Sequence, residues 1–329
     1  MKMSELKEVL KIHIQLRKPT CIWSDVGEGK SSAVRQICEE LDLECRDVRA
    51  SQFDAVDLRG LPAIRDNSTV WLTPSFLPTE QDKDGVLFLD ELNRAPIAVM
   101  NAGLQLVLDG RLGDYVLPKG WIVLCACNPE DAGVQRMSKA LSNRLSHLKL
   151  DTDLNEWCKY ANEQRWYPYT VAFLRFRPDL LRKSDIKNSH AFPTPRSWEK
   201  VAATSAYLEE HPTKNALYSY ASDVGEGPAA EYMAFLKLCQ NLPNIDLILE
   251  KPDEAPIPKK DQPAENFAVA CALARRATPE NFERVVRYIS RLPQDYAVMT
   301  VKDAITHCES LVHCKAYTQW SIQNADVFA

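Results

Sequence analysis

The residues best suited to chemistry form one short run near the start of the sequence: Ser24, Asp25, Val26, Gly27, Glu28, Gly29, Lys30, Ser31 and Ser32. Glycines in such a run let backbone N–H groups close around phosphate oxygens, and the lysine that follows neutralises the β and γ phosphates. A hydroxyl directly after the lysine is suited to binding Mg²⁺. Helical spacing begins behind the run, so a helix dipole would add to the attraction for an anion. The run therefore predicts a loop that cradles the phosphates of a nucleotide, with Ser31 on the metal.

The run departs from the G-x-x-x-x-G-K-[ST] pattern at its beginning. Ser24 stands where the pattern has its first glycine, and Asp25 adds a negative charge close to the phosphates. A negative charge weakens an anion site because like charges repel. We therefore expect these two residues to affect nucleotide binding and turnover rather than the fold.

Two adjacent carboxylates, Asp90 and Glu91, follow an apolar segment at residues 86–89. That segment is typical of a buried strand. The end of a strand beside a phosphate loop is a position where an aspartate holds Mg²⁺ in enzymes that transfer phosphoryl groups. We expect Asp90 to support the water shell of the metal. Glu91 is then placed to polarise the water that attacks the γ-phosphate.

Two polar residues further along the chain are candidates for the same site. Asn128 ends another apolar segment, residues 121–127, and could hydrogen-bond the attacking water from a neighbouring strand end. Arg144 lies off the apolar stripe of its segment, just before a predicted strand at residues 147–150, which places it at the rim of the domain. From the rim it could reach the γ-phosphate of a neighbouring subunit, which is the role of an arginine finger.

A third candidate, Arg196, belongs to the segment Thr194, Pro195, Arg196, Ser197 and Trp198. A hydroxyl residue followed by proline predicts a helix with Thr194 as its N-cap. Arg196 would then lie in the first turn, where the helix dipole disfavours a positive charge. We therefore expect an anion, such as a bound phosphate, to compensate Arg196.

Short apolar segments alternate with helical spacing over the first 150 residues. The segments that predict strands are residues 21–23, 43–48, 86–89, 121–127 and 147–150. Strands that alternate with helices indicate a parallel sheet flanked by helices. Beyond residue 151 helical spacing dominates, and a connector rich in proline and charge spans residues 251–263. The fold class predicted from these patterns is α/β, followed by a helical part.

In order and spacing, five segments resemble the MoxR-like AAA+ ATPases: GEGKS, VLFLDELNRAP, CACNPED, ALSNRLSHLKL and FPTPRSW. Two further segments look like hairpins of that family, DLRGLPAI with TVWLTPSFLP after the second strand, and LQLVLDGRLGDYVLPKGW before the fourth. The resemblance covers about residues 10 to 210. It implies a P-loop AAA+ domain at residues 1–150 and an all-α lid at residues 151–210, followed by a helical C-terminal extension at residues 211–329.

The resemblance also implies roles and partners. The roles are the Walker A pair for Lys30 and Ser31, the Walker B pair for Asp90 and Glu91, sensor 1 for Asn128, the arginine finger for Arg144 and sensor 2 for Arg196. The implied cofactors are ATP and Mg²⁺. Members of the family are similar in forming hexameric rings that remodel or activate other proteins, often beside a partner that carries a von Willebrand factor A domain.

The predicted function is Mg-ATP hydrolysis at the subunit interfaces of a homo-oligomeric ring that remodels or activates a partner protein, as a chaperone does. Two other functions stay open. A nucleotide-gated scaffold with little turnover fits the departures at Ser24 and Asp25. A motor stimulated by nucleic acid would grip DNA or RNA with a hairpin at residues 111–119, whose balanced charge lacks the basic and aromatic residues of a strand-tracking groove.

Composition limits the class of protein. The 329 residues carry a net charge of −5, which argues against broad binding of duplex nucleic acid, because such binding needs many Lys and Arg. The longest stretch without a charged residue, at residues 95–108, is too short and too polar for a membrane span. The N-terminal residues alternate charge with apolar side chains and do not form a signal peptide. We expect a cytoplasmic protein with reduced cysteines and no membrane association.

Overall fold

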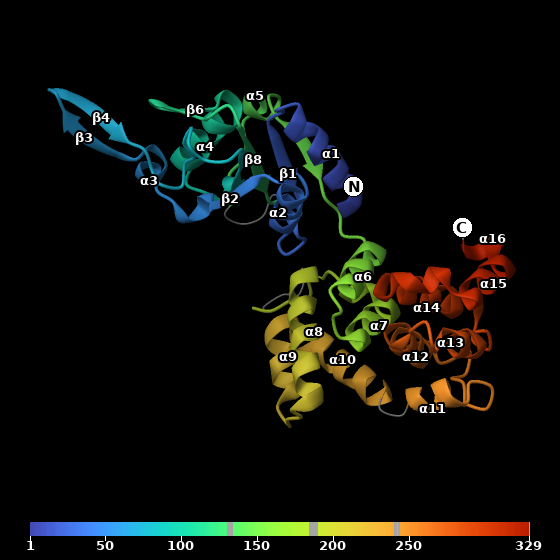
Figure 1. Cartoon of the computed structure of the whole chain (residues 1–329). Helices are drawn as coiled ribbons and strands as arrows, with labels where there is room; N and C mark the ends of the chain where they lie inside the picture. Colours follow the sequence, from blue (N-terminus) through green and yellow to red (C-terminus); the bar gives the residue numbers. More distant parts are fainter. Residues whose placement is uncertain (130–133, 184–189, 240–241, 243, 329) are drawn as a thin grey trace. The chain divides into compact units, whose positions relative to one another are not determined.

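The structure is a computed structural model that describes residues 1–129, 134–183, 190–239, 242 and 244–328. The chain divides into two compact units, Met1–Asp153 and Leu154–Ala329 (Figure 1). The first unit contains a parallel sheet flanked by helices, and the described part of the second is helical. The predicted fold class, an α/β P-loop sheet followed by a helical part, is confirmed. We describe each unit by itself.

The sheet of the first unit has five parallel strands in the order β2-β5-β8-β1-β9. All five strands predicted from the sequence are present, and their ends differ from the prediction by one residue at most. The bounds are Thr20–Trp23 for β1, Glu44–Arg49 for β2, Gly85–Asp90 for β5, Trp121–Cys127 for β8 and Ser146–Lys149 for β9. Consecutive parallel strands need a crossover, which explains the helical spacing between the apolar segments.

The central strands are apolar on both faces. All seven side chains of β8 are buried, and β5 is buried up to Asp90. Helices α1 (Met3–Gln15) and α2 (Lys30–Glu40) share one core with Ile22 and Phe88 on one face of the sheet. Helix α4 (Ile97–Asp109) shares another core with Leu89 and Cys125 on the other face. A strand covered on both faces requires a continuous apolar run, so only its last residue is available for chemistry.

Helices and short turns of the first unit connect these strands (Figure 1). The α-helices are α1 (Met3–Gln15), α2 (Lys30–Glu40), α3 (Ala55–Arg59), α4 (Ile97–Asp109) and α5 (Lys139–Ser142), and the 3-10 turns are η1 (Ala50–Gln52) and η2 (Leu92–Arg94).

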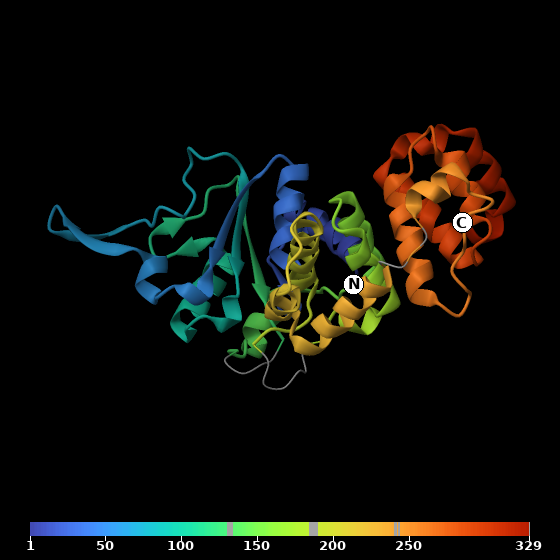
Figure 2. The same ribbon diagram turned by 90° about the horizontal axis from the view of Figure 1, so that it is seen from below.

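Two hairpins interrupt the alternation at the places where the sequence predicts them. β3 (Leu61–Arg65) pairs with β4 (Ser68–Leu72), and β6 (Arg111–Leu112) pairs with β7 (Tyr115–Val116). Asp66 and Asn67 form the turn of the first hairpin with φ angles of 47° and 57°, a conformation that favours Asp and Asn over most other residues. Figures 1 and 2 both show this hairpin projecting away from the sheet.

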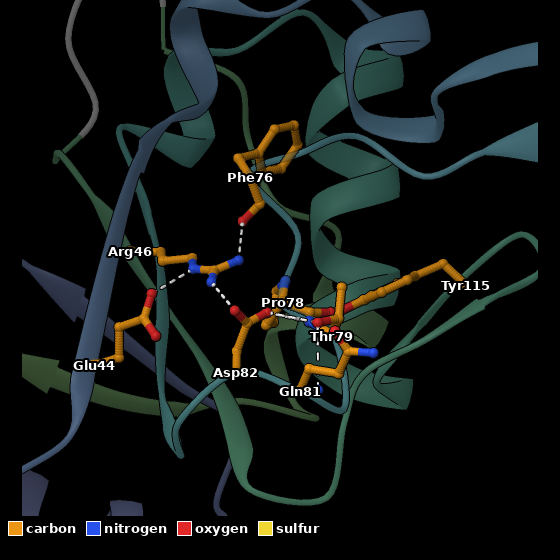
Figure 3. Close-up of polar contacts among 8 residues, drawn as sticks. All are labelled: Glu44, Arg46, Phe76, Pro78, Thr79, Gln81, Asp82 and Tyr115. Atoms are coloured by element: carbon orange, nitrogen blue, oxygen red, sulfur yellow. Dashed lines mark hydrogen bonds and ion pairs between the residues drawn. The ribbon is translucent and has the colours of Figure 1, made fainter.

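The loop that returns from the first hairpin is fixed by a polar network around Arg46 of β2 (Figure 3). The Arg46 guanidinium donates from Nε to Glu44 at 2.7 Å and pairs through Nη2 with Asp82 at 2.9 Å. Tyr115 of the second hairpin donates its hydroxyl to the Pro78 carbonyl at 2.8 Å. The network therefore ties the loop after the first hairpin both to the edge strand β2 and to the second hairpin.

The second unit is built from two adjoining groups of helices. The bounds are α6 (Leu154–Glu163), α7 (Pro168–Phe176), η3 (Pro178–Leu180), α8 (Pro195–Glu210), α9 (Ala216–Val224), α10 (Glu226–Cys239), α11 (Ile245–Glu250), α12 (Pro263–Arg276), α13 (Phe282–Ile289), α14 (Gln294–His307), η4 (Glu309–His313), α15 (Lys315–Gln323) and α16 (Ala325–Phe328).

Helices on both sides of residue 210 share one core. Phe173 of α7 and Trp198 of α8 pack against Tyr232 of α10, with ring centroids 5.2 Å and 5.8 Å from that tyrosine. The predicted connector before residue 263 contains no helix or strand after α11 ends at Glu250. The separation of a lid from a C-terminal extension stays a prediction. None of the helices in the described residues combines the length and apolar character needed to cross a membrane.

Candidate functional site

Three strand ends meet at one edge of the sheet. β8 lies between β1 and β5, and all three run in the same direction. The residues that follow them are Ser24 after β1, Asn128 after β8 and Glu91 after β5. The carboxyl ends of parallel strands are the usual place for a binding site in open α/β sheets. The order of the strands therefore brings together residues that lie far apart in the sequence.

The predicted phosphate loop has the required backbone. Gly27 and Gly29 adopt φ angles of 80° and 94°, in the left-handed region that favours glycine. A Cβ on Gly29 would also lie 3.1 Å from the Met3 side chain. Helix α2 begins at Lys30 directly behind the loop, so its N–H groups and dipole point toward an anion held there.

The Lys30 ammonium is buried and points into the loop. Its Nζ donates to the Ser24 carbonyl at 2.7 Å, to the Ser24 hydroxyl at 3.1 Å, to the Asp25 carbonyl at 3.1 Å and to Asn128 Oδ1 at 2.8 Å. An ammonium has three donors, so a phosphate that binds Lys30 must displace some of these acceptors. Ser24, which departs from the phosphate-loop pattern, is thus in direct contact with the central cation.

Ser31 and Asp90 meet where a metal is expected. The Ser31 hydroxyl donates to Asp90 Oδ2 at 2.6 Å. The pKa of the nearby Asp47 carboxyl is raised, first by burial and then by the negative charge of Asp90. Mg²⁺ prefers hard oxygen ligands and is usually held by one or two protein side chains together with waters and phosphate oxygens. The donors and the excess negative charge therefore fit Mg²⁺, with Ser31 and Asp90 as its protein contacts.

Glu91 is held in an unusual backbone conformation. Its φ of 55° lies in the left-handed region, where a residue with a side chain is strained. Its N–H donates to Asp90 Oδ1 at 2.9 Å, and the Ser51 hydroxyl donates to Glu91 Oε2 at 2.6 Å. Sequence reasoning missed Ser51, because nothing near residue 51 marks it as a partner of a residue 40 positions away.

Asn128 is oriented by a second residue that sequence reasoning missed. Asn93, in η2, donates from Nδ2 to the Asn128 carbonyl at 2.8 Å and accepts from the Asn128 N–H at 3.0 Å. Asn93 and Asn128 are 1% and 4% exposed. This reciprocal pair fixes the Asn128 backbone and leaves its side chain facing Lys30. An asparagine two residues after Glu91, directly behind a predicted strand end, is the sequence signal that could have found it.

We expect Asn93→Ala to destabilise the protein by about 2–6 kcal/mol, because two buried backbone groups lose their partners and each costs about 1–3 kcal/mol. The free energy of unfolding in urea measures this effect. Asn101→Ala, at an exposed position on α4, is the matched control and is expected to change little. Equal stabilities for the two variants would contradict the role given to Asn93.

Glu28 places a carboxylate inside the loop. Its side chain is 6% exposed. Burial raises the pKa of the Glu28 carboxyl above its ordinary value, while hydrogen bonding to Thr152 and the charge of Lys30 oppose that rise. When ionised, Glu28 offsets part of the positive charge that Lys30 presents to phosphates. The loop therefore carries an acid whose ionisation opposes nucleotide binding.

We expect Glu28→Gln to bind Mg-ATP about tenfold more tightly at neutral pH, because it removes a negative charge from an anion site. It should also be more stable. A carboxyl whose pKa is raised by folding ionises first in the unfolded chain, so stability falls as pH rises from the ordinary pKa through the raised one. The stability gained by Glu28→Gln should therefore vanish at pH values below the ordinary pKa of a glutamate carboxyl. Titration with ATP and urea melts across pH test this, with the exposed Glu39→Gln as control.

Arg144 lies at the surface of the first unit. Its side chain is 57% exposed and pairs with Asp109, at the end of α4, across 3.3 Å. This agrees with the position at the rim that the sequence predicts. Its role as an arginine finger stays a prediction.

Arg196 lies in the second unit. Thr194 caps α8 by accepting from the Ser197 N–H at 3.0 Å, and Pro195 occupies the first helical position, as predicted. Arg196 is exposed in the first turn. A contact of Arg196 with a nucleotide stays a prediction.

One comparison with protein families decides what kind of domain this site belongs to. Residues 20–145 match the family model described as "AAA domain (dynein-related subfamily)". These residues form an AAA domain. The match begins with β1 and ends after Arg144, so the AAA domain contains the phosphate loop, Asp90, Glu91, Asn128 and Arg144.

Other comparisons are distant. No curated protein matches the sequence. A structure of a RuvB mutant from Thermotoga maritima is 14% identical, covers 82% of this chain and 81% of its own, and has a TM-score of 0.42. A structure of NtrX from Brucella abortus is also 14% identical, covers 99% of this chain and 68% of its own, and has a TM-score of 0.37. Because these structural similarities are weak, the assignment of an AAA domain rests on the family match and on the residues of the site.

Proposed function

We propose that this protein is a Mg-ATP-dependent ATPase of the MoxR-like type, which hydrolyses ATP between subunits of a ring to remodel or activate a partner protein. The observation that carries the proposal is the contact of Lys30 with Asn128 at 2.8 Å beside the contact of Ser31 with Asp90 at 2.6 Å. These contacts gather groups for phosphate, metal and attacking water at one edge of the sheet.

Each residue of the site has a separate role in the proposed reaction. Lys30 and the N-terminus of α2 bind the β and γ phosphates, and Ser31 and Asp90 hold Mg²⁺, which neutralises phosphate charge. Glu91 accepts a proton from water as the water oxygen bonds to the γ-phosphorus, and the bond from that phosphorus to the β–γ bridging oxygen breaks. Asn128 orients the water by hydrogen bonding. The products are ADP and inorganic phosphate.

The remaining parts of the proposal concern the two arginines, the assembly of subunits and the partner. Arg144 reaches the γ-phosphate of the next subunit, which its exposure of 57% permits. Arg196 binds phosphate from the first turn of α8. The ring is hexameric, and the two hairpins act on the client as the nucleotide changes. A protein with a von Willebrand factor A domain is the partner class that the resemblance favours.

The test measures phosphate release from Mg-ATP per subunit over a range of protein concentrations, with Glu91→Gln measured alongside to detect contaminating ATPase. Turnover per subunit is expected to rise cooperatively with concentration and to disappear in the variant. Turnover per subunit that is independent of concentration would contradict a site shared between subunits. Activity that persists in the variant would contradict the assigned site.

A second function, a nucleotide-gated scaffold, is favoured by two features of the loop. The Lys30 ammonium lies within hydrogen-bond distance of at least four acceptor atoms of the described residues, and Glu28 adds a buried acid to the loop. Both features oppose tight phosphate binding and rapid turnover. Bound nucleotide without turnover at any protein concentration would support the scaffold. Pull-down of partners in ATP and in ADP would then be the next measurement.

A further inference from the structure

The segment that carries Arg144 is tied to the nucleotide site at two points. Residues 134–145 lie between β8 and β9 and end directly before β9. Near the start of this segment, the Gln135 N–H donates to the Asn93 carbonyl at 2.7 Å. Asn93 is the residue that orients Asn128 and follows Glu91 by two positions. The first tie therefore joins the segment to the strand ends that would contact water and γ-phosphate.

The second tie runs through His147 near the other end of the segment. The Trp23 indole N–H donates to His147 Nδ1 at 2.8 Å, and His147 Nε2 lies 2.7 Å from the Ser142 carbonyl. Because Nδ1 accepts, the proton of the neutral ring is on Nε2, which donates to Ser142. Trp23 directly precedes Ser24 of the phosphate loop, and Ser142 precedes Arg144 by two residues. His147 thus connects the loop with the turn that presents the arginine.

Arg144 is otherwise loosely held. Its ion pair with Asp109 spans 3.3 Å between side chains that are 57% and 47% exposed. Exposed ion pairs contribute little to stability, about 0–1 kcal/mol. The direction of the Arg144 side chain is therefore set mainly by the turn on which it lies. That turn is held by its own backbone hydrogen bonds, such as the one from the Leu145 N–H to the Ser142 carbonyl at 3.2 Å, and by His147, which links it to β1.

We infer that His147 is a positioning residue that couples the nucleotide bound by one subunit to the arginine that the same subunit offers to its neighbour. The inference rests on the proposed function and adds a regulatory step to it. A phosphate that displaces the Ser24 acceptors of Lys30 shifts the loop at the end of β1. Trp23 and His147 pass that shift to Ser142, and the turn then presents or withdraws Arg144. An empty subunit consequently fails to activate the next one.

The test uses mixed rings of two full-length subunits. The receiver carries Arg144→Ala and has an intact Glu91. The donor carries Glu91→Gln and has an intact Arg144, so turnover arises only at receiver sites completed by a donor. Adding Lys30→Ala to the donor empties its own site. We expect this change to lower phosphate release by about fivefold or more, the lower range of allosteric coupling.

The decisive comparison adds His147→Phe to the donor with an intact Lys30 and to the donor with Lys30→Ala. The phenylalanine ring is similar in size but removes every hydrogen bond of the imidazole: the one from Trp23 and those to the carbonyl and the hydroxyl of Ser142. We expect receivers to release little phosphate with His147→Phe donors. The release should be the same whether the donor keeps Lys30 or carries Lys30→Ala. His13→Phe is the matched control, because His13 also hydrogen-bonds near β1, to the Thr20 hydroxyl at 2.9 Å, but does not contact residues 134–145 in the described hydrogen bonds. This control should retain the full effect of Lys30→Ala.

Two outcomes separate this inference from the proposed function. If the unmodified donor does not restore turnover to the receiver, the shared site is wrong and this inference falls with it. If the unmodified donor restores turnover but Lys30→Ala still lowers phosphate release when the donor carries His147→Phe, the coupling through His147 is overturned and the shared site is not.

A second variant protects the test against a folding defect. Trp23→Phe removes the same hydrogen bond from the other side, and thermal melts confirm that each variant is folded. We expect Trp23→Phe to reduce the Lys30→Ala effect as His147→Phe does, and the double variant to show no further loss, because both substitutions break one connection. Additive losses would overturn the connection.

Discussion

Glu91→Gln is expected to lower ATP turnover about 100-fold or more while leaving Mg-ATP binding nearly unchanged. The amide cannot accept the proton of the attacking water, and general-base catalysis contributes about 100-fold to 10,000-fold. Binding should be retained because the proposed contacts of phosphate and metal are with Lys30, Ser31 and Asp90, whereas the proposed partner of Glu91 is water. Phosphate release and equilibrium binding of Mg-ATP, measured on the same preparation, separate the two effects.

Two further variants make this prediction specific. Asp90→Asn removes the charge next to Ser31 and is expected to weaken binding of Mg-ATP more than binding of ATP without metal, because Asp90 is the proposed partner of Mg²⁺. Glu80→Gln makes the same change of charge at an exposed loop position and should resemble wild type. A Glu91→Gln variant with wild-type turnover would remove Glu91 from the chemistry.

Arg144→Ala is expected to lower turnover about 1,000-fold, the lower limit of the effect of an arginine finger. The loss follows because the guanidinium stabilises the charge that develops on the transferred phosphoryl group. Since Arg144 is exposed and would act on the neighbouring site, nucleotide binding by the variant should be close to wild type. Phosphate release at a protein concentration that saturates assembly measures the effect.

Mixing separates an action on the neighbour from an action within one subunit. Arg144→Ala subunits and Glu91→Gln subunits are each inactive, yet a mixture should recover turnover at interfaces that pair an intact Glu91 with an intact Arg144. Arg111→Ala, an exposed arginine on the second hairpin, is the matched control and should keep its activity alone. A mixture as inactive as its components would show that Arg144 does not act between subunits.

The elements of the first unit were predictable because their signals are local. Apolar runs such as residues 121–127 are continuous since both faces of β8 are buried, and this can be seen without knowing the neighbours of the strand. The loop proposed to bind phosphate could be recognised for a similar reason. Its glycines, lysine and serine would act through backbone geometry and charge within a few residues, and the structure has Gly27 and Gly29 in the left-handed region and the Lys30 ammonium at the Ser24 carbonyl.

The partners of the site residues were not predictable from local patterns. Ser51 and Glu91 are 40 positions apart, and Asn93 and Asn128 are 35 apart. Each pair depends on which strands are neighbours, and alternating strands and helices leave several orders open. The contact of Lys30 with Asn128, 98 positions away, requires β8 to lie beside β1. The sequence therefore identified Asn128 as a candidate but could not predict its hydrogen bond with Lys30.

The sequence by itself determined the α/β fold class and the strands, and it supplied the residue types of the proposed phosphate and metal site. Those properties follow from the spacing of apolar side chains and from short runs whose chemistry is local, whereas the two hairpins were expected from the family resemblance. Only the tertiary structure decided that Ser51 holds Glu91, that Asn93 orients Asn128 and that His147 joins Trp23 to Ser142. The physical reason is that these contacts are polar and long-range, so they exist only after buried apolar strands have been packed in one order.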